Sequence, residues 1–118
     1  SRGYFRLLYE LSRPLAYAAV CDGRLVGFAM GILYPNGLLH VVDVAVVEEY
    51  RGRGLGARLV TRLEEDAVAR GASLAFLETW VSNTRAQRFY ERLGYRPLRV
   101  IPGYYEWGEA AILYVKPL

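Results

Sequence analysis

Apolar runs separated by turn residues predict three consecutive β-strands in the first part of the chain. The runs 15–21 and 24–34 flank Asp22-Gly23, a pair that accepts positive φ at both corners of a tight hairpin. A second turn at 35–37 precedes the valine-rich run 38–47. We therefore predict three antiparallel strands, of which the third is covered on both faces.

The next part of the chain changes to the spacing of an amphipathic helix. Leucine or alanine recurs every four residues from Leu55 to Ala67, and Gly71 follows as a C-terminal cap, which predicts a helix of about four turns. The run 73–81 is again apolar and predicts a strand. Asn83 can then cap a second helix that ends at Gly94. Its predicted buried stripe consists of Ala86, Phe89, Tyr90 and Leu93.

The two ends of the chain add a helix and two strands. Apolar residues at helical spacing over 4–12 predict a short helix that Pro14 terminates, and the runs 95–101 and 110–116 predict a closing pair of strands. This order predicts an α/β fold with a mixed sheet, antiparallel in its N-terminal strands and parallel across a strand-helix-strand crossover. We assign residues 1–118 to one domain, because 53% are hydrophobic and only 23% are charged.

Charge and composition argue against several classes of protein. The net charge is +3, and all but one of the fifteen basic residues are arginines, the exception being Lys116. The arginines form no continuous basic stripe, so we expect no nucleic-acid partner. No apolar run reaches the roughly 20 residues that span a bilayer, so we expect no membrane partner. A single cysteine, Cys21, excludes an intramolecular disulfide, and without a secretory signal pattern we expect a soluble, cytoplasmic protein.

Three glycines at alternating positions lie between the third predicted strand and the first long helix. Gly52, Gly54 and Gly56 allow the backbone to approach a ligand closely. The first turn of the helix adds unpaired N–H groups and the positive end of the helix dipole, an arrangement that suits a pyrophosphate. The alternative is a glycine-rich turn that binds no ligand.

Two common phosphate-binding patterns do not fit this loop. A nucleoside-triphosphate loop requires Gly-Lys-Ser/Thr, whereas Gly56 is followed by Ala57 and Arg58. A dinucleotide-binding turn requires Gly-x-Gly-x-x-Gly, whereas these glycines run Gly-x-Gly-x-Gly and follow antiparallel strands. Glu78 lies near the distance at which dinucleotide folds carry an acidic residue, but the chain is too short for a doubly wound sheet.

The residues of this loop resemble a known family. Arg51-Gly52-Arg53-Gly54-Leu55-Gly56 matches the Arg/Gln-x-x-Gly-x-Gly/Ala loop of the GNAT superfamily of N-acetyltransferases. Ser82-Asn83, followed by Ala86 and the run 89–95, resembles the family's second signature, a helix near the thiol end of CoA. Gly103-Tyr104-Tyr105, Gly108-Glu109-Ala110 and the final Lys116-Pro117-Leu118 resemble the branch that acetylates protein N-termini, including ribosomal-protein alanine acetyltransferases and archaeal N-terminal acetyltransferases. The resemblance covers about residues 15–118.

The resemblance implies a site for acetyl-CoA as cosubstrate, with no metal. In the family, the backbone of the strand before the loop pairs with the pantetheine arm, which here assigns Val44, Ala45 and Val46. The pyrophosphate is held by the loop and first helical turn, which here comprise Arg51, Gly52, Arg53, Gly54, Leu55, Gly56 and Ala57. Asn83 is expected near the pantetheine arm, and Tyr90 near the sulfur as proton donor to the leaving thiolate.

An acceptor amine also requires a base. A protein α-amino group has a pKa of about 7.7 to 8.0, so much of it is protonated at neutral pH. Glu78 stands where relatives carry a glutamate or histidine that activates the amine; the alternative is an ordinary strand-end carboxylate facing solvent. His40 matches a position where relatives carry a catalytic histidine or tyrosine; the alternative is a hydrogen-bonded core residue. We hypothesise that Glu78, assisted by His40, accepts the amine proton through water.

The acceptor implied by the resemblance is a protein or peptide N-terminus, with ribosomal proteins among the candidate targets. Tyr104 and Tyr105 lie in the loop that covers the first residues of the peptide in such enzymes, although one of the two rings could instead pack inward. Two alternatives stay open, namely acetylation of a lysine side chain or small amine, and a CoA-binding domain without catalytic activity. Because the family begins with a further strand and helix, the resemblance implies that this chain lacks them.

Overall fold

The computed structural model describes residues 13–118, so the helix predicted over 4–12 lies outside the described residues. In chain order the elements are the strands β1 (Arg13–Cys21), β2 (Arg24–Leu33) and β3 (Leu38–Val46), the 3₁₀ turn η1 (Glu48–Tyr50), the helix α2 (Leu55–Ala69), the strand β4 (Leu74–Trp80), the helix α3 (Thr84–Arg92), and the strands β5 (Arg96–Ile101) and β6 (Ala111–Pro117). Within the described part, no helix is long and apolar enough to cross a membrane.

The strands form one six-stranded sheet in the order β1-β2-β3-β4-β6-β5. All neighbouring pairs are antiparallel except β3 and β4, which are parallel and connected through α2. The predicted mixed α/β sheet is therefore confirmed. The β6 strand inserts between β4 and β5, an order that the sequence pattern did not predict.

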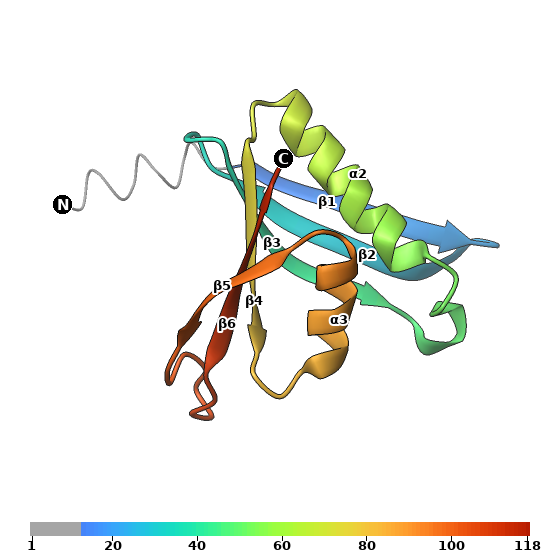
Figure 1. Ribbon diagram of the computed structural model, residues 1–118. Helices are drawn as coiled ribbons and strands as arrows, with labels where there is room; N and C mark the ends of the chain where they lie inside the picture. Colours follow the sequence, from blue (N-terminus) through green and yellow to red (C-terminus); the bar gives the residue numbers. More distant parts are fainter. Residues whose placement is uncertain (1–12) are drawn as a thin grey trace.

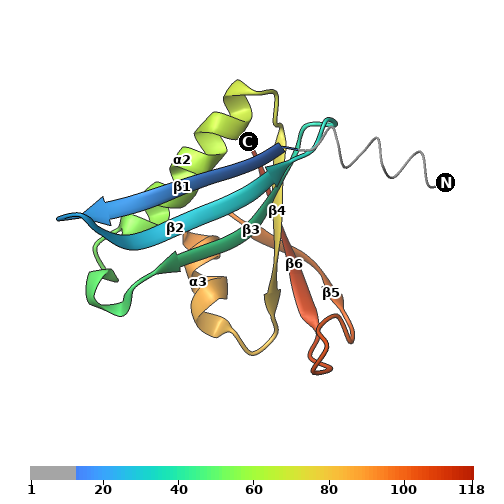
Figure 2. The ribbon, with the colours of Figure 1, turned by 180° about the vertical axis from the view of Figure 1, so that it is seen from behind.

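The parallel pair at the centre of the sheet is short. Only residues 38–40 of β3 pair with residues 74–76 of β4, although both strands continue beyond this point. On its other side, β3 skips one residue in its pairing with β2, because Asp43 pairs with Met30 and Val41 pairs with Gly31. Such a bulge bends the strand. Figures 1 and 2 show β3 and β4 diverging from their paired end, so that the sheet opens in its middle.

The local turn signals take the predicted backbone conformations. Asp22 and Gly23 have φ values of 51° and 75°, as a tight hairpin with two left-handed corners requires. Gly71 and Gly94 both have φ of 100° and follow the ends of α2 and α3, which confirms them as C-terminal caps.

The hydrophobic core lies between the sheet and α2, which crosses β1, β2 and β3 in Figure 1. Leu59 and Leu63 of α2 are buried against β2, where Gly27 and Gly31 leave room for them. A Cβ atom at Gly27 would lie 3.3 Å from a methyl carbon of Leu59 and 3.0 Å from the carbonyl oxygen of Ala45. The absence of side chains at these two positions thus allows close helix-sheet packing.

Two expectations about burial were wrong. The third strand is not covered on both faces: Leu39 and Val41 are buried, but Val42 is 48% exposed and Ala45 is also exposed. The exposed residues lie in the half of β3 that has separated from β4, where the side chains of β4 no longer lie beside them. The stripe of α3 is also only half-buried, because this short helix packs beside the opening in the sheet.

A buried polar cluster connects α2 to the C-terminal strands. Glu64 of α2 is only 7% exposed, and its two carboxylate oxygens accept hydrogen bonds from Lys116 Nζ at 2.9 and 3.1 Å. The hydroxyl of the buried Tyr95 donates to Glu64 Oε2 at 2.7 Å. A carboxylate can be buried here because a cation and a phenol together satisfy it.

Candidate active site

A cleft of about 370 Å³ occupies the opening between β3 and β4. Its walls come from β3, β4, the start of α3 and the loop between β5 and β6. The lining includes residues 40–44 and 77–80, together with Asn83, Ala86, Tyr90, Tyr104 and Tyr105. The three residues predicted to be catalytic, His40, Glu78 and Tyr90, all line this cleft, although they belong to three different elements.

His40 and Glu78 are in direct contact. Nε2 of His40 lies 2.8 Å from Oε2 of Glu78, and the two side chains are 22% and 16% exposed. The imidazole also stacks on the ring of Phe76, its pairing partner in β4, at 4.5 Å between centroids and 9° between planes. Packing on one side and the carboxylate on the other fix the orientation of the ring. The structure thus provides a carboxylate and an imidazole, partly accessible to solvent, that together can accept and hold a proton.

Tyr90 lies on the α3 side of the cleft. Its ring is half-buried and packs edge-on against Phe89 and Tyr95, at centroid distances of 5.0 and 5.6 Å. Burial, reinforced by the negative charge of Asp43, raises the pKa of Tyr90 to about 12. The phenol therefore keeps its proton at neutral pH, which suits a proton donor and not a base.

Tyr104 and Tyr105 lie at the mouth of the cleft in different environments. The hydroxyl of Tyr104 donates to Oε1 of Glu78 at 3.5 Å, the long end of the hydrogen-bond range. Tyr105 stacks on Trp107, with 4.6 Å between centroids and 15° between planes. Burial, followed by the charge of Glu78, raises the pKa of Tyr104 and of Tyr105. Both rings line the cleft, so neither is simply an inward-packed aromatic.

The glycine-rich loop joins β3 to α2 next to this cleft. Gly52 and Gly54 have φ values of 78° and 77°, and a Cβ atom at either position would meet no other atom of residues 13–118 within 4 Å. Their requirement for glycine is therefore conformational. Gly54 is the N-cap of α2, and within the described residues no side chain caps this helix and no acidic residue lies in its first turn. The free N–H groups of that turn fit an anionic group such as a pyrophosphate.

Gly56 is a glycine for a different reason. A Cβ atom at this position would lie 3.2 Å from two ring carbons of Phe89, so the residue allows α2 and α3 to approach each other closely. From the sequence, all three glycines are expected to allow the close approach of a ligand. In the structure, Gly56 serves helix-helix contact, while its backbone remains in the first turn of α2.

The arginines of the loop are partly engaged with the protein. Nε of Arg51 donates to the carbonyl oxygen of Val46 at 2.9 Å, and Nη2 of Arg53 donates to the carbonyl oxygen of Glu49 at 3.3 Å. The guanidinium of Arg53 also lies 5.0 Å from the centre of the Tyr50 ring. These bonds fold the loop against the end of β3, and the remaining N–H groups of the arginines keep a positive charge beside the helix N-terminus.

The edge of β3 that faces the opening carries the residues predicted to pair with pantetheine. Val44, Ala45 and Val46 pair with β2 on one side, but β4 has already separated on the other. Val47 donates its N–H to Val26 toward β2, and because backbone groups alternate in direction, Val44 and Val46 direct theirs toward the opening. The carbonyl of Val46 already accepts a hydrogen bond from Arg51, but β4 does not pair with this edge, so an extended, amide-containing ligand fits it.

Asn83 is confirmed as the N-cap of α3. Its side-chain oxygen accepts a hydrogen bond from the N–H of Ala86 at 3.2 Å, and the residue also lines the cleft. The predicted absence of a metal site remains a prediction, and residues 13–118 contain no cluster of three or more His, Cys, Asp or Glu residues that could hold a metal ion.

Three residues around the cleft were not given a role by sequence reasoning. Asp43 lines the cleft and acts on Tyr90 through its charge. Its signal in the sequence was an acidic residue inside a valine-rich strand, directly before the glycine loop. Trp80 and Trp107 form an exposed aromatic lip. The centroid of the Trp80 ring lies 6.0 Å from that of Tyr105 and 6.0 Å from that of Trp107. Their sequence positions gave no indication that these rings meet.

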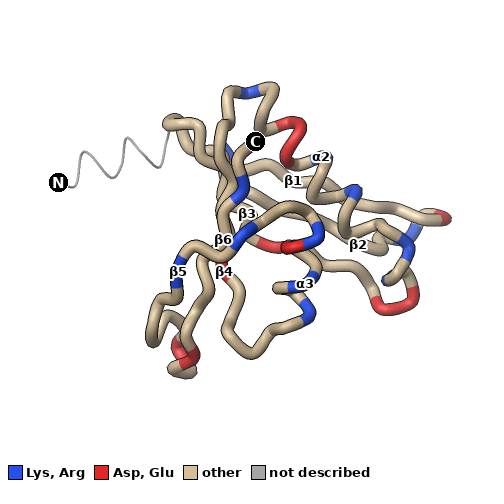
Figure 3. The backbone as a smooth tube through the Cα atoms, in the orientation of Figure 1, with Lys and Arg blue, Asp and Glu red and all other residues tan. Residues whose placement is uncertain are grey.

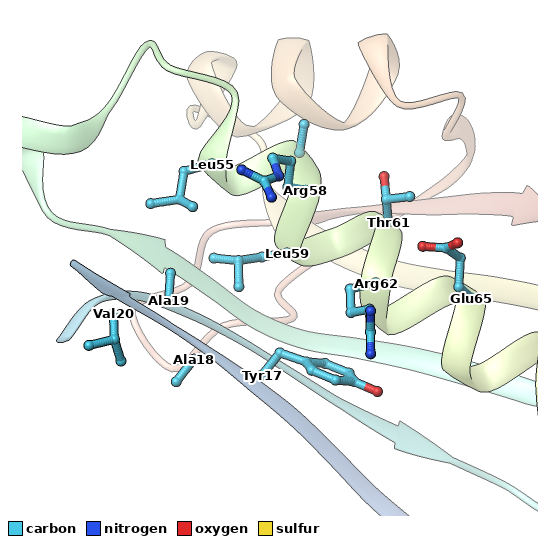
Figure 4. A pocket seen from close by; sticks show the side chains of 11 residues that line it. Tyr17, Ala18, Ala19, Val20, Leu55, Arg58, Leu59, Thr61, Arg62 and Glu65 are labelled. Atoms are coloured by element: carbon cyan, nitrogen blue, oxygen red, sulfur yellow. The ribbon is translucent and has the colours of Figure 1, made fainter. Parts of the chain in front are cut away.

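A larger hollow of about 700 Å³ lies elsewhere, between β1 and α2 (Figure 4). It lies beside Tyr17, whose hydroxyl donates to Asp66 at 2.6 Å and whose ring lies 5.7 Å from the guanidinium carbon of Arg62. None of His40, Glu78 and Tyr90 lines this hollow. We therefore place the candidate active site in the smaller cleft, where the groups suited to acid-base chemistry converge.

Comparisons with known proteins agree with this architecture. Residues 1–95 match the model of the acetyltransferase (GNAT) family. An uncharacterized N-acetyltransferase of Methanocaldococcus jannaschii is 43% identical over 102 residues, which cover 85% of this chain and 64% of the relative. An N-alpha-acetyltransferase of Saccharolobus solfataricus is 39% identical over 114 residues, covering 86% of this chain and 68% of the relative. The chain thus spans about two thirds of the length of these relatives.

A solved structure extends the likeness to the fold. The ribosomal-protein-S18-alanine N-acetyltransferase of Escherichia coli superposes with a TM-score of 0.79 at 28% sequence identity, covering 99% of this chain and 76% of that one. The family model, the relatives and the solved structure agree with one another. The chain belongs to the acetyltransferase (GNAT) family, whose members use acetyl-CoA as the acetyl donor.

Proposed function

We propose that this protein transfers the acetyl group of acetyl-CoA to the α-amino group of protein or peptide N-termini in the cytoplasm. The observation that carries the proposal is the contact between His40 and Glu78 in a cleft that also contains Tyr90. An acid-base pair facing a proton donor is what transfer between an amine and a thioester requires. Two archaeal relatives named N-alpha-acetyltransferase support the choice of acceptor, and the Escherichia coli neighbour makes ribosomal proteins candidate targets.

Acetyl-CoA supplies the acetyl group as a thioester. In the proposal, the open edge of β3 at Val44, Ala45 and Val46 holds the pantetheine arm, with Asn83 close by. The pyrophosphate lies on the loop and first turn of α2, residues 51–57. The uncapped N–H groups of that turn support this assignment.

The side chains in the cleft take different roles in proton transfer. Glu78, held by His40, accepts the proton of the ammonium group through water, so that the amine can attack the carbonyl carbon. Tyr90 gives its proton to the sulfur as the carbon–sulfur bond breaks, which is supported by a pKa that keeps the phenol protonated. The attacking nitrogen still carries one proton more than the amide product, and this proton returns to the Tyr90 phenolate through water. Tyr104 and Tyr105 line the mouth, where the first residues of the peptide enter.

The proposal is tested with acetyl-CoA and two matched peptides. One has a free α-amino group and no lysine, and the other has a blocked N-terminus and an internal lysine. Mass spectrometry should find acetylation of the first peptide only. Acetylation of the second alone would indicate a lysine acetyltransferase. Calorimetric binding of CoA without turnover on a panel of peptides and small amines would indicate a domain that binds CoA without catalysis.

A further inference from the structure

The carboxylate side chains that line the candidate cleft have no basic counterpart there. Of residues 13–118, no lysine or arginine lines the cleft, whereas Asp43 and Glu78 do. The loop 102–110, which carries the two tyrosines at the mouth, adds Glu106 and Glu109 and contains no basic residue. This acidity stands out in a chain with a net charge of +3. Figure 3 shows acidic positions in the loop between β5 and β6, whereas α2 carries both basic and acidic positions and β5 carries basic ones.

The negative charges differ in how far they are neutralised by the protein. Glu109 is engaged, because its two oxygens accept the N–H of Ser82 at 2.9 Å and the indole N–H of Trp107 at 3.0 Å. The carboxylate of Glu78 is in hydrogen-bonding contact with His40. Asp43 and Glu106 are exposed to solvent, and Asp43 is close enough to Tyr90 for its charge to act on the phenol.

An aromatic lip borders the same mouth. Trp80 and Trp107 are 41% and 63% exposed, they contact each other edge-on, and Tyr105 packs against both. The faces of aromatic rings attract cations, and tryptophan does so most strongly. At the mouth of the cleft, aromatic faces and carboxylates both favour a positively charged peptide. The carboxylates would repel an acidic peptide, and the aromatic faces would not attract it.

We propose that the acceptor cleft selects N-terminal segments that carry lysine or arginine in the residues following the first, and rejects segments that carry aspartate or glutamate there. Asp43 and Glu106 are the specificity-determining residues, and the aromatic lip supports them. This inference rests on the proposed function, since it names the substrate class for that activity. The chemical class of the partner is a basic, extended protein N-terminus.

The test uses three peptides of about eight residues that share their first two residues and differ only at positions 3 and 4, which are Lys-Lys, Gln-Gln or Glu-Glu. The ratio of kcat/KM values between peptides is measured with saturating acetyl-CoA for acetylation of the α-amino group, which fragment mass spectrometry distinguishes from acetylation of lysine side chains. A ratio removes effects common to all substrates. At about 0.02 M salt we expect the lysine peptide to exceed the glutamate peptide by about tenfold or more. At about 0.3 M salt the ratio should shrink, since screening weakens exposed charges.

Single substitutions test whether Asp43 and Glu106 cause the preference for the lysine peptide. Asp43→Asn and Glu106→Gln should each reduce the lysine-to-glutamate ratio by about threefold at low salt. Glu65→Gln is the matched control, because it removes the same charge from an exposed position of α2 that lines the other hollow, and it should leave the ratio unchanged. Equal rates for the three peptides, or a ratio that neither substitution alters, would overturn the selection of basic segments while the N-terminal activity stands. Failure to acetylate any of the peptides would overturn the proposed function itself.

Discussion

Nε2 of His40 lies 2.8 Å from Oε2 of Glu78, directly beyond the point at which β3 and β4 stop pairing. His40 belongs to the last paired position, opposite Phe76, while Glu78 is two residues further along β4. Because the strands separate from here on, both side chains line the cleft that forms between β3 and β4. The same feature that opens the sheet also exposes its acid-base pair.

Glu78→Gln should lower kcat/KM for a peptide acceptor by about 10²-fold or more at neutral pH, because the amide cannot accept the amine proton. The loss should diminish as the pH rises above about 8, where the α-amino group loses its proton without help. A pH-rate profile of the variant and the wild type measures this. Near-normal activity of the glutamine variant at neutral pH would remove Glu78 as the base.

Tyr90→Phe should lower kcat by about 10²-fold while leaving the KM for acetyl-CoA within a small factor, because only the proton to the thiolate is lost. The pKa of Tyr90, about 12, lies above its ordinary value of 10.0, so the phenol stays protonated until the pH passes the raised value. Wild-type kcat should consequently show no decline from this group below about pH 11. A decline near pH 9 that disappears in the phenylalanine variant would contradict the predicted state of the donor.

Gly56→Ala should weaken acetyl-CoA binding and cost about 1 kcal/mol of folding stability, because the new Cβ meets the Phe89 ring at 3.2 Å. Calorimetric binding of CoA and thermal unfolding provide the measurements. Adding Phe89→Leu to Gly56→Ala should recover part of the lost affinity, because the smaller side chain vacates the contact. No recovery in the double variant would mean that the helix contact is not the reason for this glycine.

Lys116→Met should destabilise the fold by about 3 kcal/mol, because it leaves Glu64 buried without its cation. Chemical denaturation measures the free energy of unfolding. The double variant Lys116→Met/Glu64→Leu should lose much less than the sum of the two single changes, since no buried charge is left unpaired. Simple additivity would show that the two side chains do not interact energetically.

The local structure was well predicted from short stretches of sequence. The hairpin at Asp22-Gly23, the caps at Gly71, Asn83 and Gly94, and the extents of the strands agree with the structure within one or two residues. These features depend on the backbone preferences of a few neighbouring residues, so the information lies close together in the chain. The candidate site residues also came from the sequence, through the resemblance carried by the glycine loop and the Asn83 helix.

The spatial relationships in the site could not be read from the sequence. His40 and Glu78 are separated by 38 residues, and their contact depends on where β3 and β4 part. The influence of Asp43 on Tyr90 depends on how α3 packs beside β3, and the aromatic lip depends on the insertion of β6 between β4 and β5.

The sequence by itself determined the elements, their order and the types of chemical group available to the site. Only the tertiary structure decided which of those groups meet, that Gly56 serves a helix contact, and that acidic residues but no lysine or arginine of residues 13–118 line the cleft in a basic chain. The physical reason is that turns and caps are stabilised by interactions between near neighbours. Strand order, the opened sheet and the charge around the cleft arise instead from packing between segments far apart in the chain.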